Sequence, residues 1–518
     1  MGSSALRKEF FVWIAIVWPV LITNISQTGM GLTDISFLGH YNRADPLDNS
    51  TSVSKSTTYV SAASLGNIYN SLMNVLIVKG INSAGQILIS QALGAKNFRL
   101  AKSYLYVCLC LVTLFGMPIV LSYIWAGQIL DYFSGLGEEL TALTTSYTRT
   151  LAVGFIPFLW YQAFNSYLVS NHVTMPQMVL SMACFCLNLL FNALFLYGWG
   201  PDWAGFGFIG SPMATVGSRC VLCIGGFAIV RHLMSKHKKA QIPLSDMSES
   251  PPQAIEDGAC TGITIERMKK LLLLGLPLSL SMLLEDGQLQ FIAILAARIG
   301  KISIATHNSM LNFVWVLTSM MWAVSGATRV RVAFYLGAGN VEGAKRVIKI
   351  ASVCGGGIGT LIALTFIVLR VEIGHLFSND PLVWHLATKI STLCGLGYLA
   401  LVIFYINMAT LGAQGRPMAI ALSFVLGAWV CCIPLAFFFA FHLEQTKGLF
   451  GLWLALAFGY GITTTLSSLY VWKSDWAGIV RRVQNDAEVN NTTINHDNQE
   501  YVPLESGDDE RHGRYGST

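Results

Sequence analysis

Charged residues are scarce in this chain. Aspartate, glutamate, lysine and arginine make up 12% of its 518 residues, against about 25% in soluble globular proteins. Apolar residues make up 53%. This composition excludes an ordinary soluble domain or a nucleic-acid-binding protein, and it is typical of a chain that crosses the lipid bilayer several times.

Catalytic and cofactor-binding motifs are also absent. The sequence has no P-loop, no dinucleotide fingerprint, no Gly-x-Ser-x-Gly element and no zinc signature. Its ten histidines show no metal-ligand spacing, and of its eleven cysteines only Cys260 lies in a polar segment. We therefore expect neither an ATP-driven pump nor an enzyme, and no cofactor.

Long apolar segments are plentiful instead, and a membrane-spanning helix needs about 20 such residues. Six segments precede a polar stretch and six follow it, which predicts an all-α polytopic membrane protein with twelve transmembrane helices in two six-helix lobes. The expected parts are an N-terminus at 1–9, a first lobe at 10–231, a linker at 232–265, a second lobe at 266–472 and a largely disordered tail at 473–518.

Basic residues predict the orientation. They concentrate in the loops on one side of the expected bundle, for example Lys96, Arg99, Lys102, Lys345, Arg346 and Lys349. Because cytoplasmic loops are enriched in lysine and arginine, we expect both termini and the linker in the cytoplasm. The plasma membrane is expected, with the vacuolar membrane as the alternative. The sequon at Asn49 then lies outside and is a predicted glycosylation acceptor.

The two halves share a short motif. Gly94, Ala95, Asn97, Ala101 and Lys102 match Gly337, Ala338, Asn340, Ala344 and Lys345, each 243 positions later (337 minus 94). The helix prolines Pro19 and Pro277 are 258 positions apart, a difference that a longer first loop in the first half explains. Repeats of six helices share one orientation, so the lobes are expected to be related by a pseudo-two-fold axis along the membrane normal.

Polar residues in the first half point to a site in its apolar helices. Gln27 and Asp34 share one stripe of the first helix, and Asn188 and Asn192 share a face of the fifth. Two carboxamides either orient an acid, supply oxygens to a small cation, or simply link helices. Tyr161 and Thr215 are weaker candidates of the same kind.

Two adjacent carboxylates, Glu285 and Asp286, lie in the middle of the seventh segment. An ionisable group at that depth costs roughly 2.5–3.5 kcal/mol, so it is a functional candidate by default. The two are about 100° apart around a helix, and we expect that they do not face the same cavity. Glu285 shares its stripe with Gln288, and spacing alone does not choose between the acids.

The chain resembles the multidrug and toxic compound extrusion (MATE) family over roughly residues 10–475. The carriers are QTGMGLTD ending in Asp34, SQALGAKN after the second segment, LGLPLSLSMLLE ending in Glu285, and SGATRVRVAFYLGAGN ending in Asn340. Their order across both halves is specific, although each motif alone is weak.

The resemblance implies a twelve-helix antiporter, functional as a monomer, that exports organic cations or amphiphilic metabolites in exchange for protons or sodium ions. Asp34 and Glu285 match the family's coupling acids, and Asn188 and Asn192 match polar partners of Asp34. Gln290 stands where many eukaryotic members have a second acid, which favours proton coupling.

Two alternatives stay open: a sodium-coupled exporter, and a related lipid-linked sugar flippase with a cationic cavity.

We also expect Asp34 to lie across the cavity from Glu285, and Asp286 to have a packing or interface role.

Overall fold

The computed structural model describes residues 2–41, 52–135, 137–199, 203–240, 263–377 and 381–486. Asn49, most of the expected linker and the end of the tail lie outside these ranges. Within them the chain is helical apart from turns and one isolated bridge between Trp199 and Trp203.

The first lobe holds six spans. They are formed by α1 (Gly2–Gly39), α2 (Ser52–Met73) with a π-helical turn (Asn74–Val78) and α3 (Lys79–Gly94), α4 (Phe98–Ser122), α6 (Glu138–Val153) with α7 (Phe155–Ser170), α8 (Met175–Tyr197) and α9 (Gly210–Ala240); α5 (Ala126–Ser134) is a short connector.

The second lobe repeats this pattern. Its spans are α10 (Ile265–Ile299), α11 (Lys301–Gly337), α12 (Val341–Val368), α14 (Pro381–Ala413), a run from α15 (Pro417–Phe424) through α16 (Ile433–Phe437), and α17 (Leu449–Trp472). A short α13 (Arg370–Phe377) precedes α14, and residues 476–486 are helical.

The outer surface of these helices is apolar. Nine helices of the described ranges are long and apolar enough to cross a membrane, and the bent pair of α2 and α3 makes a tenth. Phe11, Leu114, Ile224 and Leu361 are each more than half exposed, while hydroxyls, amides and carboxylates are buried inside. With α10 and the α6–α7 run, the predicted all-α fold of twelve spans is confirmed.

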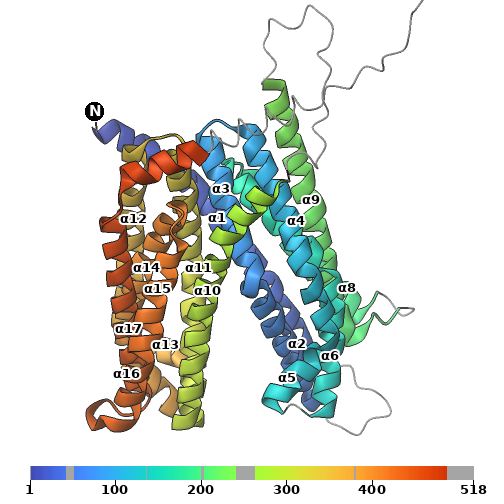
Figure 1. The fold of residues 1–518 in the computed structure, drawn as a ribbon. Helices are drawn as coiled ribbons and strands as arrows, with labels where there is room; N and C mark the ends of the chain where they lie inside the picture. The colour runs from blue at the N-terminus through green and yellow to red at the C-terminus, as the bar shows by residue number, and fades with distance from the viewer. Residues whose placement is uncertain are drawn as a thin grey trace, which may run out of the picture.

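The two lobes meet at the end of the molecule where the N-terminus lies and spread apart toward the other end (Figure 1). We call these the terminal end and the open end. Contacts between α3 and both α10 and α11, and between α1 and α11, join the lobes at the terminal end.

The repeated glycines explain how closely the lobes approach. A Cβ on Gly94 of α3 would lie 1.9 Å from the Phe334 carbonyl oxygen, and one on Gly337 of α11 would lie 2.0 Å from the Gln91 carbonyl oxygen. Phe334 is 243 positions after Gln91, the offset of the repeated motif (334 minus 91). The two motifs therefore touch each other reciprocally, as a pseudo-two-fold axis between the lobes requires.

The rest of the motif ends one helix and begins the next. Lys96 and Gly339 have left-handed backbones, with φ of 60° and 73°. The Asn97 carboxamide oxygen then accepts a hydrogen bond from Leu100 N, and that of Asn340 accepts one from Gly343 N, so each asparagine caps the following helix. This shared geometry is the physical reason that the motif recurs.

Candidate functional site

A central cavity lies between the lobes. It encloses about 1480 Å³, part of it open to solvent, and its walls come from α1, α3 and α7 of the first lobe and from α10, α11 and α14 of the second. Its lining mixes amides, aromatic rings and charged groups. The lining includes Asn24, Gln27, Asn82, Gln86, Phe158, Trp315, Trp322, Lys79, Glu285, Asp286 and Arg329. Such a site can hold an amphiphilic organic molecule.

Glu285 is buried in α10, with 7% of its surface exposed. The Tyr405 hydroxyl, on α14, donates a 2.7 Å hydrogen bond to its Oε1 atom. The same carboxylate borders a second pocket inside the second lobe, of about 540 Å³ including space open to solvent, whose other walls include Trp453 and Tyr460. Glu285 thus stands where the central cavity meets an inner aromatic pocket.

The first lobe carries a neutral version of this pair. Gln27 Nε2 donates to the Tyr161 hydroxyl at 3.1 Å, and that hydroxyl also pairs with Ser181. Glu285 is 258 positions after Gln27, the offset of the two helix prolines, and Tyr405 is 244 after Tyr161. The structure brings Gln27 and Tyr161 together, with Gln27 about two turns of α1 away from Asp34.

Asp34 lies inside the first lobe and is almost fully buried. Thr215 Oγ1 donates to it at 2.6 Å and Asn192 Nδ2 at 3.0 Å, while the Tyr147 hydroxyl lies 3.5 Å away. Asn188 Nδ2 donates to Thr215 Oγ1 at 3.3 Å and so helps to position the hydroxyl that binds Asp34. The predicted residues Asn188, Asn192 and Thr215 converge on Asp34.

Tyr147 is the member that the sequence did not single out. It comes from α6, where one tyrosine among several threonines gives no distinct signal. The remaining predicted residue, Gln288, is fully buried one turn after Glu285, and its side chain makes no hydrogen bond within the described chain.

Two expectations about the acids are wrong. Glu285 and Asp286 both line the central cavity, because that cavity is wide enough to wrap around more than 100° of α10. Asp34 does not lie across the cavity from Glu285: it is outside the lining, since α1, α6, α8 and α9 enclose it. The structure therefore gives each lobe its own buried carboxylate.

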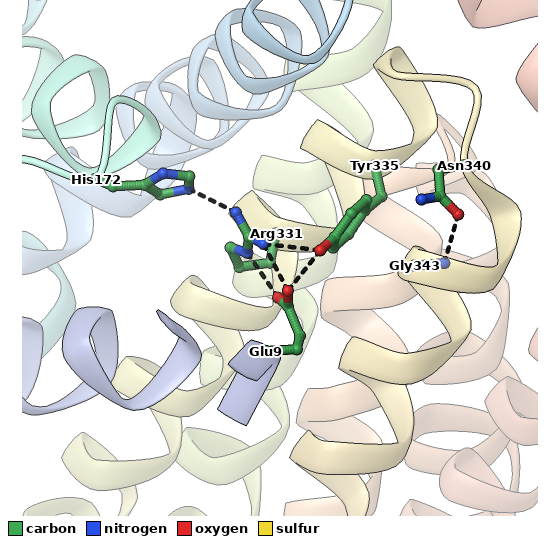
Figure 2. Close-up of polar contacts among 6 residues, drawn as sticks. All are labelled: Glu9, His172, Arg331, Tyr335, Asn340 and Gly343. Carbon is green, nitrogen blue, oxygen red and sulfur yellow. Dashed lines mark hydrogen bonds and ion pairs between the residues drawn. The ribbon is translucent and has the colours of Figure 1, made fainter. Parts of the chain in front are cut away.

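Figure 2 shows a third polar cluster, at the terminal end, that the sequence did not predict. Arg331 of α11 binds both carboxylate oxygens of Glu9 of α1, at 2.8 and 2.7 Å, and all these side-chain groups are buried. The Tyr335 hydroxyl donates to the same carboxylate. The cluster connects the start of the first lobe to the second.

His172 completes this cluster from the turn between α7 and α8. Its Nε2 atom lies 3.4 Å from Arg331 Nη1. Burial, and then the Arg331 guanidinium, lower the pKa of His172 from 6.5 to about 4. The ring is thus neutral near pH 7, and Nε2 accepts the hydrogen bond when the proton is on Nδ1.

The His172 backbone adds to its interest. Its φ is 60°, a left-handed value that is uncommon outside glycine. Gly415, 243 positions later, has φ of 69° in the corresponding turn of the second lobe. The first lobe thus has a histidine at a turn position where the second lobe has a glycine. The His172 side chain contacts Arg331 of the second lobe.

The chain is similar to known transporters over most of its length. It is 23% identical over 461 residues to the uncharacterized transporter C4B3.13 of Schizosaccharomyces pombe, covering 88% of this chain and 77% of the relative. It superposes on the eukaryotic MATE transporter AtDTX14 with a TM-score of 0.77, 19% identity and coverage of 93% and 100%.

A bacterial structure agrees with this fold. An aspartate-to-asparagine mutant of the Vibrio cholerae MATE transporter VcmN gives a TM-score of 0.76 at 18% identity, covering 92% of this chain and all of the other. The MatE family model matches residues 19–194 and 277–438, which is more than half of the chain. The protein therefore belongs to the MATE family of membrane efflux transporters.

Proposed function

We propose that this protein is a proton-coupled antiporter that exports amphiphilic organic compounds, with Glu285 as the proton-binding group of the central cavity and Asp34 as a second one in the first lobe. The position of Glu285 carries the proposal. It is a buried carboxylate, held by one hydroxyl, that faces both the substrate-sized cavity and an inner pocket.

The charge of Glu285 links proton and substrate. An ionised carboxylate in a dry site binds a basic group, and a proton on the same oxygen removes that attraction. Protonation also removes a buried charge, whose desolvation otherwise opposes repacking of the lobe. For a substrate with no net charge, one proton moving down 100 mV supplies about 2.3 kcal/mol, enough for roughly fifty-fold accumulation.

The proposed orientation puts the terminal end in the cytoplasm, as the basic loops favour. The state described above is then open to the outside. In this state a proton reaches Glu285 and a basic substrate leaves; after the lobes rock to open the terminal end, the proton leaves and the next substrate binds. Transport between the two states needs no covalent chemistry.

Sodium coupling at Asp34 is the second candidate, and one observation favours it. The Oδ1 atom of Asn192 is buried beside Asp34 and accepts no hydrogen bond from any described residue. A spare oxygen next to a carboxylate and a hydroxyl is what a small hard cation uses. By contrast, Gln290 is exposed on α10, so it contributes nothing to the Glu285 site.

The test is dye efflux from proteoliposomes driven by a proton gradient or by a sodium gradient alone. We expect the proton gradient to drive efflux, Glu285→Gln to reduce it at least tenfold, and the sodium gradient to drive none. Efflux that follows sodium and is lost in Asp34→Asn would favour the second candidate. Wild-type, proton-driven efflux in both variants would refute the proposal.

A further inference from the structure

An apolar groove runs along the outer surface of the first lobe. It spans about 2090 Å³, including open space, and lies between α4 and α9, which both pack against α7. Trp160 and Phe164 of α7 form its base. Its walls include Leu114 and Met117 of α4 and Phe227 of α9, each more than half exposed. Because these helices cross a bilayer, lipid chains are what such a surface meets.

The groove is about as long as one leaflet of the bilayer. Its lining extends over residues 105–117 of α4 and 223–234 of α9, which at 1.5 Å per residue are about 18 and 16 Å long. The hydrocarbon core is about 30 Å thick, so one leaflet takes up about 15 Å. Both stretches lie next to the basic residues that bound the apolar run at the terminal end, Lys102 on α4 and Arg231 on α9. The groove therefore belongs to the leaflet on that side.

These two cations stand on opposite walls of the groove. Arg231 is exposed and lines it, and among the described residues the guanidinium has no hydrogen bond or ion pair. The Lys102 ammonium lies 5.6 Å from the centre of the ring of Tyr106, another lining residue. None of the described lining residues is acidic. The groove thus joins a basic end to an apolar body.

Two polar groups deeper in the groove satisfy each other. Trp160 Nε1 donates a 2.8 Å hydrogen bond to Thr113 Oγ1, and Thr113 Oγ1 donates to the Leu109 carbonyl oxygen at 2.7 Å. The indole therefore offers its apolar ring to the groove. This inner part suits a hydrocarbon chain better than a polar ligand.

We propose that the groove binds one anionic phospholipid of the bilayer, with its phosphate on Arg231 and Lys102 and its acyl chains between α4 and α9. Arginine binds phosphate by charge-assisted, frequently bidentate hydrogen bonds, and lysine adds a point charge. The terminal end is the proposed cytoplasmic side, where anionic lipids concentrate. The choline of a zwitterionic lipid would cancel part of the attraction, so charge selects the headgroup.

The lipid also reaches the junction between the lobes. Ile263, which lines the groove, lies two residues before α10, the helix that carries Glu285. The bound lipid thus contacts α4, α9 and the chain that enters the second lobe. Contact on three sides distinguishes this site from a smooth helix face, and it does not depend on the ion that drives transport.

Native mass spectrometry of the full-length protein tests the proposal. The protein is released from nanodiscs that hold equal amounts of phosphatidylglycerol and phosphatidylcholine with the same acyl chains. Each basic residue near a membrane surface is worth about fivefold in binding an anionic lipid. We therefore expect phosphatidylglycerol to be retained at least fivefold over phosphatidylcholine, Arg231→Gln to lose about fivefold of that retention, and Arg231→Lys to keep most of it.

Lys236→Gln is the charge-matched control. Lys236 is exposed on the same helix but outside the groove, so retention should not change. Excess glycerol phosphate, a headgroup without chains, should not displace the lipid. Four results would each overturn the proposal: equal retention of both lipids by wild type, undiminished retention in Arg231→Gln, an equal loss in Lys236→Gln, or displacement by glycerol phosphate.

Discussion

Glu285 in the second lobe occupies the position that Gln27 occupies in the first. Glu285 accepts a hydrogen bond from the Tyr405 hydroxyl, and Gln27 donates one to the Tyr161 hydroxyl. The offset from Gln27 to Glu285 is that of the two helix prolines, whereas Tyr405 is one position beyond the 243-position offset from Tyr161. The two lobes therefore share a hydrogen-bonded pair of this kind, and the pair is ionisable only in the second lobe. Its ionisable member is the one that faces the central cavity and an inner pocket together.

Tyr405→Phe tests this asymmetry. It removes a hydrogen bond to a charged group, worth roughly 1.5–3 kcal/mol, and we expect proton-driven efflux to fall about tenfold. Tyr161→Phe is the matched change in the first lobe, where the bond to Gln27 is neutral, and we expect less than a threefold effect. Equal effects in the two variants would contradict a special role for the charged pair.

Part of this architecture could be predicted from the sequence. Apolar segments indicated the helices, and the Gly-Ala-x-Asn motif indicated the repeat, because both are local features. Asn192 and Asp34 could be paired only through the family resemblance, because spacing alone left open whether Asn188 and Asn192 orient an acid, bind a cation or link helices. Helical spacing did not show how the lobes dock, and so missed the contact between Glu9 and Arg331, 322 positions apart. Helical spacing also does not give the width of the central cavity. That width is the reason that Glu285 and Asp286 both line it.

The Glu9–Arg331 pair is expected to hold the terminal end closed. Glu9→Gln leaves a buried guanidinium without its carboxylate, which costs roughly 3–5 kcal/mol. We expect faster hydrogen–deuterium exchange in the turn around His172 and at the end of α11. Glu342→Gln, in an exposed pair with Lys345 at 3.9 Å, is the control and should change nothing. Unchanged exchange in Glu9→Gln would mean that other contacts hold this end.

His172 is expected to make that closure sensitive to acid but not to alkali. Its pKa is about 4 here against 6.5 unperturbed, so the opened state binds more protons than the closed one between these values. Closure therefore weakens as the pH falls from about 6.5 to 4 and is constant above 7. The rate of hydrogen–deuterium exchange at the terminal end, corrected for the intrinsic pH dependence of amide exchange, measures this weakening. His172→Gln should remove the pH dependence of closure. A dependence unchanged in that variant would assign it to another group.

The reciprocal glycine contacts predict two equivalent variants. Gly94→Ala and Gly337→Ala each place a methyl group about 2 Å from a backbone carbonyl oxygen of the other lobe, which the backbone cannot accommodate without separating the lobes. Both are expected to open the terminal end and to slow transport by a similar factor. Gly356→Ala, where a Cβ meets nothing within 4 Å, is the control. A large difference between the first two variants would contradict the pseudo-symmetric docking.

Competition between proton and substrate for Glu285 is the core of the proposed mechanism. Isothermal titration calorimetry of tetramethylrhodamine binding, repeated in buffers of different ionisation enthalpy, counts the protons released per molecule bound. We expect wild type to release protons on binding, because a bound basic group displaces a proton from the carboxylate, and Glu285→Gln to release none. Release that is absent from wild type, or that persists unchanged in Glu285→Gln, would contradict this mechanism.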